Sequence, residues 1–191
     1  MVATPSTMVP LGAVAPDFAL PDPSGVVHTL DGVLDGKRGL LVAFICNHCP
    51  YVKHLRRELA LLADRWQQRG LAVVAINSND FDAYPDDAPA AMAAEARTVG
   101  YRFPYLVDET QEVALAYRAA CTPDFFLFDE ARRLVYRGQF DGSRPKNDLP
   151  VTGADLDAAV RAVLDGRPVP GEQRASIGCN IKWRPGVDPG Y

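Results

Sequence analysis

Hydrophobic residues in the first half of the chain form two kinds of pattern, which alternate. Residues 40–46 and 71–76 are continuous apolar runs, which are typical of short strands buried on both faces of a sheet. From Pro50 onward, apolar residues recur at steps of three and four among charged ones, which predicts an amphipathic helix that ends before Gly70. The order strand, helix, strand with short links predicts a parallel pair of strands.

The same alternation continues in the second half of the chain. Two mostly apolar runs, residues 125–128 and 134–137, lie on either side of a turn. This pattern predicts two adjacent strands that pair antiparallel. The fold class is thus α/β, with a central mixed β-sheet flanked by helices. The elements predicted in this half are a helix at 88–99, a strand at 104–107, a helix at 111–118, the two antiparallel strands, and a helix at about 154–164.

The two ends of the chain lack this regular alternation. Residues 12–30 contain two short extended stretches around a turn rich in Pro, Asp and Gly, which predicts an N-terminal β-hairpin extension. The segment 166–191 is rich in Pro and Gly, yet Ile177 and Trp183 are apolar enough to pack on the body. We therefore expect one domain, residues 12–165, and a mobile C-terminal tail, residues 166–191, that packs on it.

Composition narrows the class of protein. A chain of 191 residues with 48% hydrophobic residues suits one compact domain, and 24 acidic against 20 basic residues offer no surface for nucleic acid. The first thirty residues contain no Lys or Arg and are interrupted by prolines, so we expect no secretory signal and a cytoplasmic location. The longest apolar run, residues 40–46, is far shorter than the roughly 20 residues that span a bilayer, so no membrane association is expected.

The four cysteines direct attention to redox chemistry, because a reducing compartment disfavours structural disulfides. Cys46, Asn47, His48 and Cys49 form a CxxC motif where a buried strand meets a helix, and a helix N-terminus stabilises a thiolate. We predict that Cys46 is the nucleophile and that Cys49 resolves the mixed disulfide. A protonated His48 would favour the Cys46 thiolate further, unless it is only a solvated loop histidine.

Zinc binding and inert burial are the competing interpretations of the motif. A structural zinc site usually takes four ligands, often as two CxxC pairs, and the chain has one such pair. Cys121 and Cys179 could complete a site only through the fold. Inert burial would require neither the spacing nor the polar Asn47 and His48. We therefore expect neither a metal nor a bound cofactor.

Several stretches of the chain resemble the thioredoxin superfamily, and specifically its peroxiredoxin-like branch of alkyl hydroperoxide reductase and thiol-specific antioxidant (AhpC/TSA) proteins. The resemblance implies a thioredoxin-like fold over about residues 12–165, and the tail is similar to the end of a peroxiredoxin-like subgroup. The stretches are Ala15-Pro16-Asp17-Phe18 with Asp22 and Gly25, residues 44–53 around the CxxC motif, Cys121-Thr122-Pro123-Asp124, and residues 176–183.

This resemblance implies roles for the loop that precedes residue 125. Pro123 would be cis and packed against the CxxC motif, and Thr122 would present backbone groups to an extended partner. Asn47, Thr122 and Pro123 are therefore candidate partner-binding residues. Cys121 and Cys179 are candidate accessory thiols: Cys121 is either redox-active or a small buried filler, and Cys179 is either a resolving thiol or a packed tail residue.

The chain also departs from peroxiredoxins, which carry Pro-x-x-x-Thr-x-x-Cys. Aligning their peroxide-reactive cysteine on Cys49 puts Cys46 at the threonine and Val42 at the proline. Cys49 is thus the candidate thiolate in a peroxidase interpretation, with Arg118 as a candidate stabilising charge. The missing threonine hydroxyl weakens that interpretation.

We therefore predict a thiol–disulfide oxidoreductase that cycles a Cys46–Cys49 dithiol and disulfide in antioxidant defence or redox homeostasis. The alternatives are a thiol peroxidase with Cys49 or Cys46 as the peroxide-reactive thiolate, and a non-catalytic redox sensor or metal-binding protein. Expected partners are protein or small-molecule thiols and disulfides, or peroxides, with a reductant such as a thioredoxin or glutathione system. The chain should act as a monomer or homodimer. The pKa of Cys46 should lie below the value near 8.5 of a free thiol, and His48→Ala should raise it.

Overall fold

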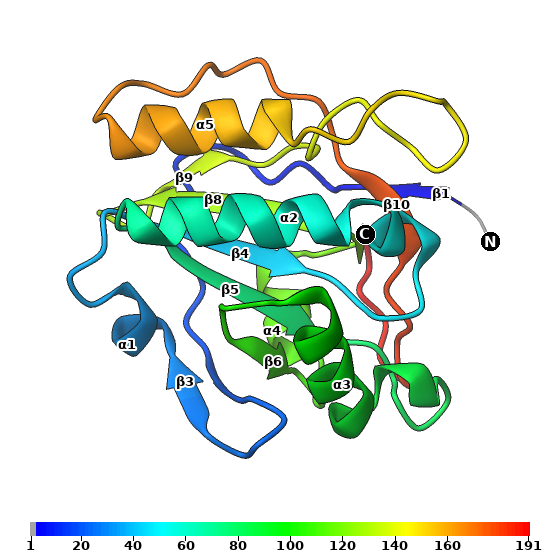
Figure 1. Cartoon of the computed structure of the whole chain (residues 1–191). Coiled ribbons are helices and arrows are strands. Elements are labelled where there is room, and N and C mark those ends of the chain that lie inside the picture. Colours follow the sequence, from blue (N-terminus) through cyan, green and yellow to red (C-terminus); the bar gives the residue numbers. More distant parts are fainter. Residues whose placement is uncertain (1–2) are drawn as a thin grey trace.

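A five-stranded mixed sheet forms the centre of the protein in the computed structural model, which describes residues 3–191 (Figure 1). The central strands β4 and β5 are parallel, and β8 runs antiparallel to β4. This arrangement confirms the predicted mixed sheet. In order across the sheet, the strands are β6 (Tyr105–Val107), β5 (Ala72–Asn77), β4 (Gly39–Phe44), β8 (Asp124–Asp129) and β9 (Leu134–Tyr136).

Helices cover both faces of this sheet, so its central strands are buried throughout. One face packs against α2 (Pro50–Gln68) and α5 (Ala154–Leu164), through residues such as Leu59 and Leu156. The other face packs against α1 (Leu30–Leu34) and α4 (Glu112–Tyr117). Because consecutive strand side chains alternate between the faces, each strand contributes to both cores.

The long helix α2 ends as its sequence pattern predicts, at the glycine turn after Gln68. The predicted alanine-rich helix is α3 (Pro89–Val99), and a short 3-10 turn, η1 (Pro85–Asp87), precedes it. The N-terminal hairpin is also confirmed, as β2 (Ala19–Pro21) paired antiparallel with β3 (Val27–Thr29).

The C-terminal segment packs on the rest of the protein, as expected, but as part of a sheet and not as an irregular, mobile tail. It contains strand β10 (Ile177–Asn180), which lies in a second sheet between β1 (Ala3–Pro5) and β7 (Cys121–Thr122). Both pairings are antiparallel. Figure 1 shows β1 and β10 beside the N-terminal end of α2, and α2 and β10 are in contact. Backbone pairing on both sides therefore holds the segment in place.

A buried ion pair joins β8 to the loop after β9. The Arg137 guanidinium donates to the Asp124 carboxylate at 3.2 Å and to the Arg118 carbonyl oxygen at 2.8 Å, and both charged side chains are fully buried. The guanidinium also lies over the Phe126 ring, 4.2 Å from its centroid. The charge of Arg137 therefore interacts with Asp124 and Phe126 at this edge of the sheet.

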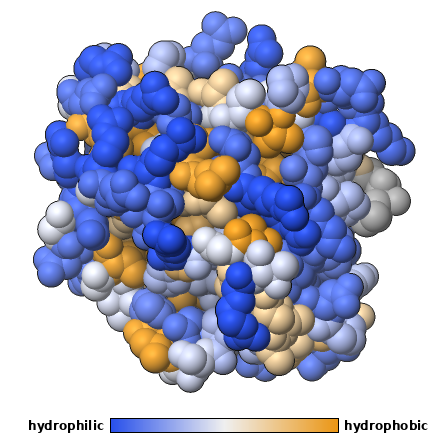
Figure 2. Space-filling model, in the orientation of Figure 1, coloured by the Kyte–Doolittle hydropathy of each residue, from blue (hydrophilic) through white to orange (hydrophobic). Residues whose placement is uncertain are grey.

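Figure 2 shows a hydrophilic face on which hydrophobic residues form only small, separate patches. Within residues 3–191, no helix is both long and apolar enough to cross a bilayer.

Candidate active site: a buried cluster of three thiols

The CxxC motif lies between the end of β4 and the start of α2. Strand β4 ends at Phe44, and the first helical residue is Pro50, so Cys49 and not Cys46 is the N-cap of α2. The unpaired amides and positive end of the helix dipole therefore act most directly on Cys49. All four cysteines of the chain are buried and reduced.

Three sulfur atoms and Thr122 form the centre of the site. The Cys46 Sγ atom is 3.2 Å from the Thr122 hydroxyl, and the Cys49 thiol donates to the Thr122 carbonyl oxygen at 3.1 Å. The Cys49 and Cys179 Sγ atoms are 2.9 Å apart. The peptide bond between Thr122 and Pro123 is cis, as the family resemblance implied. The fold thus brings together Cys46, Cys49, Thr122, Pro123 and Cys179 from three separate stretches of sequence.

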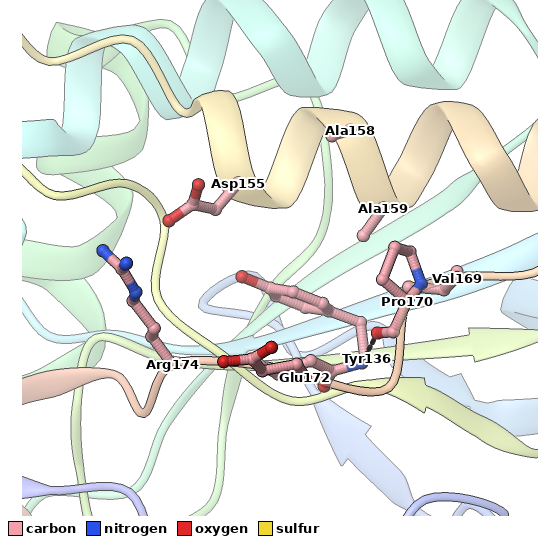
Figure 3. A pocket seen from close by; sticks show the side chains of 9 residues that line it. Tyr136, Asp155, Ala158, Ala159, Val169, Pro170, Glu172 and Arg174 are labelled. Carbon is pink, nitrogen blue, oxygen red and sulfur yellow. Dashed lines mark hydrogen bonds between the residues drawn. The ribbon is translucent and has the colours of Figure 1, made fainter.

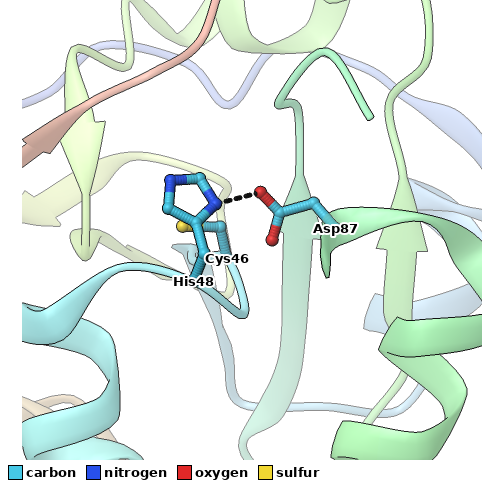
Figure 4. Close-up of side chains that lie close together, drawn as sticks. All are labelled: Cys46, His48 and Asp87. Carbon is cyan, nitrogen blue, oxygen red and sulfur yellow. Dashed lines mark hydrogen bonds and ion pairs between the residues drawn. The ribbon is translucent and has the colours of Figure 1, made fainter. Parts of the chain in front are cut away.

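A buried carboxylate that we did not predict supports the motif from η1. Asp87 is 1% exposed and accepts a 2.6 Å hydrogen bond from His48 Nδ1 and a 2.7 Å bond from the Asn47 amide (Figure 4). The Asn79 side-chain amide donates to it at 2.8 Å. Burial alone would raise the pKa of Asp87, but these hydrogen bonds, led by that from His48, hold it below its usual value. Asp87 is therefore an ionised acceptor that orients the motif.

His48 lies at the outer side of the site. Its ring stacks on Tyr84 with centroids 5.3 Å apart, and its Nδ1 proton is committed to Asp87. Among the described residues, no group forms a hydrogen bond with the buried His48 Nε2 atom. The tautomer that Asp87 selects leaves a lone pair on Nε2, which can accept a proton.

Asn47 contacts other parts of its own chain. Its side chain donates to the Asp86 carbonyl oxygen at 2.8 Å and accepts a 3.1 Å bond from the Tyr105 hydroxyl, and the residue is 8% exposed. The backbone of Thr122 is likewise paired with Cys179 in the β7–β10 ladder. Partner binding by Asn47, Thr122 and Pro123 therefore stays a prediction, and an extended partner at β7 would have to displace β10.

The protonation of the two motif thiols differs from the sequence-based prediction. Hydrogen bonding from Cys46, acting against burial, lowers the pKa of Cys49 to about 5, and Cys179 contributes a further hydrogen bond. Donation to Cys49, burial and the Asp87 charge raise the pKa of Cys46 well above its usual value. The Thr122 carbonyl oxygen favours protonated Cys49, but two thiol donors outweigh this one acceptor.

Our prediction that the pKa of Cys46 is lowered is therefore wrong in this structure. The prediction placed Cys46 at the helix N-terminus, but that position belongs to Cys49, and Cys46 has the Asp87 carboxylate nearby. Within this pair of buried thiols, the pKa directions make Cys49 the more acidic group and Cys46 the less acidic one. Which sulfur attacks a substrate first stays a prediction.

Two other candidates make their side-chain contacts with other groups. The Cys121 thiol donates to the Pro123 carbonyl oxygen at 3.5 Å, and burial raises its pKa. The Arg118 guanidinium lies over the Tyr191 ring, 5.1 Å from its centroid, at the end of the chain. Arg118 is thus occupied by a cation–π contact.

Among the described residues, one group has the spacing of candidate metal ligands. It consists of Cys46, His48 and Asp87, and one ligand atom of each lies within 4.8 Å of the others. However, Asp87 already accepts the hydrogen bonds described above, and His48 Nδ1 donates one of them. Metal binding would break these bonds, so the cluster suits an acid–base pair beside a thiol better than a metal centre.

A cavity of about 450 Å³ lies between α5 and the segment that follows it (Figure 3). Tyr136, Asp155, Glu172 and Arg174 are among its lining residues, which include no cysteine or histidine. It is therefore separate from the thiol site.

Three features define a thiol redox protein with a thioredoxin-like fold: the mixed sheet, the cis-proline loop, and the CxxC motif at the start of α2. More distant solved structures share this fold. The chain belongs to the AhpC/TSA family, whose model matches residues 11–137. This match confirms the branch that the sequence resembles.

Individual proteins of known sequence or structure are consistent with this assignment. A hypothetical protein from Sinorhizobium meliloti 1021, SMc02350, is 55% identical, with a TM-score of 0.94 over 96% of this chain and 100% of that one. An uncharacterized conserved protein from Geobacillus kaustophilus is 53% identical, with a TM-score of 0.95 over 98% and 99% of the two chains. The thiol-disulfide oxidoreductase ResA of Geobacillus kaustophilus (strain HTA426) is 26% identical over 76% of this chain and 78% of ResA.

Proposed function

We propose that this protein is a thiol–disulfide oxidoreductase in which Cys46 and Cys49 cycle between dithiol and disulfide. The observation that supports this most is that both motif thiols contact Thr122 of the cis-proline loop, Cys46 at its hydroxyl (3.2 Å) and Cys49 at its carbonyl oxygen (3.1 Å). The lowered pKa of Cys49 and the raised pKa of Cys46 agree with a dithiol of unequal acidity. In this proposal a substrate disulfide accepts two electrons from the pair: one sulfur attacks it, the mixed disulfide forms, and the second sulfur releases the reduced partner. His48 is oriented by Asp87 and has a ring nitrogen within 4.8 Å of the Cys46 Sγ atom, and in this proposal it accepts and returns the proton of Cys46.

The partners in this proposal are protein or small-molecule disulfides and thiols, with a thioredoxin or glutathione system as reductant. Because both motif thiols are at most 1% exposed, a partner gains access only when a covering element moves. The covering strand β10 is held through backbone pairing with β7, which is also the backbone that an extended partner would use.

A thiol peroxidase is the second candidate function, and the specific observation in its favour is the low pKa of Cys49, about 5. Cys49 is also the residue that aligns with the peroxide-reactive cysteine of the family. Cys46 stands where the peroxiredoxin threonine would be, so its thiol and not a hydroxyl would face the peroxide.

One experiment separates the two functions. The reduced protein is mixed either with oxidised glutathione or with hydrogen peroxide, quenched in acid, and its trapped thiols are mapped by mass spectrometry. The same is done for Cys46→Ser and Cys49→Ser, with Cys121→Ser as the matched control. Oxidoreductase function predicts a Cys46–Cys49 disulfide with glutathione in wild type and Cys121→Ser, and slow peroxide consumption. Fast catalytic peroxide consumption with sulfenic acid trapped on Cys49 would replace this proposal with the peroxidase.

A further inference from the structure

Strand β10 holds the Cys179 thiol directly against Cys49. Their Sγ atoms are 2.9 Å apart, whereas a disulfide bond is about 2.05 Å long, so a shift of less than about 1 Å would join them. Cys179 is 2% exposed and Cys49 is fully buried, so the contact is enclosed. The ladder pairing of Cys179 with Thr122 sets this position, because Thr122 itself contacts both motif thiols.

The close approach of β10 depends on a residue without a side chain. A Cβ atom on Gly178 would lie 2.0 Å from the Thr122 carbonyl oxygen and 2.5 Å from its carbonyl carbon, both of them backbone atoms. Only glycine therefore allows β10 to come this near to the cis-proline loop. The Ser176 hydroxyl donates to the Pro123 carbonyl oxygen at 2.7 Å and holds the start of the strand in the same place.

Cys49 thus interacts with both of the other thiols in the cluster, Cys46 and Cys179. We propose that Cys179 is a third redox-active thiol, which takes over the disulfide of the CxxC motif. The Cys179 thiol gives up its proton and its sulfur attacks Cys49 Sγ of the Cys46–Cys49 disulfide. The bond to Cys46 breaks, and Cys46 leaves with the electron pair and takes up a proton, so the number of protons is unchanged. One disulfide is exchanged for another, so no further oxidant is required. This inference rests on the proposed function, which supplies the first disulfide.

The electrostatic environment of Cys179 changes when the CxxC motif is oxidised. In the reduced protein, burial and donation to Cys49 raise the pKa of Cys179 to about 12, so its proton stays in place. Once Cys49 is part of a disulfide it carries no negative charge, and the second of these causes is removed. The product has Cys46 as a thiol and β10 covalently joined to the start of α2.

The test uses the positions of the tryptic sites. Cleavage after Arg38 and Lys53 leaves both motif cysteines in one peptide, 39–53, and cleavage after Arg174 and Lys182 leaves Cys179 in another, 175–182. A Cys46–Cys49 disulfide is therefore a loop within one peptide, whereas a bond to Cys179 links two peptides. The full-length reduced protein is oxidised with diamide, quenched and alkylated in acid, digested, and fragmented between Asn47 and His48 to assign the linked sulfur.

The proposal predicts that wild type yields the linked peptides with the bond at Cys49. Cys46→Ser should lose two thiols per chain on oxidation, through the Cys49–Cys179 bond alone, and Cys46→Ser with Cys179→Ser should form no such bond. Gly178→Ala keeps every thiol, yet the linked product should fall by about tenfold or more, because disulfide geometry tolerates little separation. Cys121→Ser should behave as wild type, because its thiol contacts the Pro123 carbonyl oxygen instead.

The outcomes separate this inference from the proposed function. A looped 39–53 peptide in wild type, with no linked product in either wild type or Cys46→Ser, would overturn the role of Cys179 and leave the Cys46–Cys49 cycle intact. Linked product in wild type, with no looped peptide in wild type, Gly178→Ala or Cys179→Ser, would contradict the proposed cycle itself. An undiminished linked product in Gly178→Ala would show that the bond does not arise from the β7–β10 geometry, and would also overturn the inference.

Discussion

Removing the Cys46 thiol should raise the pKa of Cys49, because the hydrogen bond from Cys46 is the largest cause of its low value. Cys46→Ala deletes this donor and leaves the helix N-terminus and the Cys179 contact in place. Cys46→Ser is the conservative partner variant, since a hydroxyl at the same position can still donate to the thiolate.

The size of the change follows from the strength of such a bond. A hydrogen bond to a charged group contributes about 1.5–3 kcal/mol, and one pKa unit corresponds to about 1.4 kcal/mol, so its loss is worth about one to two units. The pKa of Cys49, about 5 in the wild type, should therefore rise to between about 6 and 7 in Cys46→Ala. In Cys46→Ser the rise should be about half of this or less.

The ultraviolet absorbance of the thiolate measures this titration. Between about pH 4 and pH 8 the signal should come from Cys49, because the other three cysteines have raised pKa values. Alkylation by iodoacetamide over the same range, followed by peptide mass spectrometry, assigns the titrating sulfur. Cys121→Ser serves as the control and should give the wild-type curve.

An unchanged midpoint in Cys46→Ala would refute the hydrogen-bond argument. Complete loss of the low-pH thiolate signal in that variant, with no signal at higher pH, would place the wild-type thiolate on Cys46. That result would restore the sequence-based prediction and remove the reason for assigning the charge to Cys49.

Three further predictions follow from other parts of the structure. The low pKa of Cys49 should stabilise the reduced fold fully above the usual thiol pKa of 9.0, and this stabilisation should be lost as the pH falls through about 5. Urea unfolding of the reduced protein should therefore show a free energy of unfolding that rises with pH between these two values. Cys49→Ser should not show this rise. Arg137→Met leaves Asp124 buried without its partner and should lower the free energy of unfolding, measured in urea, by about 3–5 kcal/mol. The control Arg167→Met, in an exposed ion pair, should cause no measurable loss. Equal losses in the two variants would contradict the argument from burial. Elemental analysis of purified protein should find far less than one metal ion per chain, and stoichiometric zinc or copper would count against a dithiol function.

Much of the fold was predictable from local pattern. Hydrophobic runs and helical spacing predicted β4, α2, β5, α3 and α5 to within about two residues at each end, because Pro, Gly and side-chain periodicity act over a few neighbouring positions. Strands β1, β7 and β10 escaped prediction, because two to four residues are too short to show an alternating pattern. The cytoplasmic location and the choice between monomer and homodimer stay predictions.

The amino-acid sequence by itself determined that a CxxC motif lies where a buried strand meets a long helix, and its spacing and family resemblance determined the redox class. Only the tertiary structure decided which sulfur holds the charge. That choice depends on Asp87, 39 residues from His48, and on Cys179, 130 residues from Cys49. Hydrogen-bond donors and nearby charges determine a thiol pKa, and the folding of distant segments against one another brings those groups into contact.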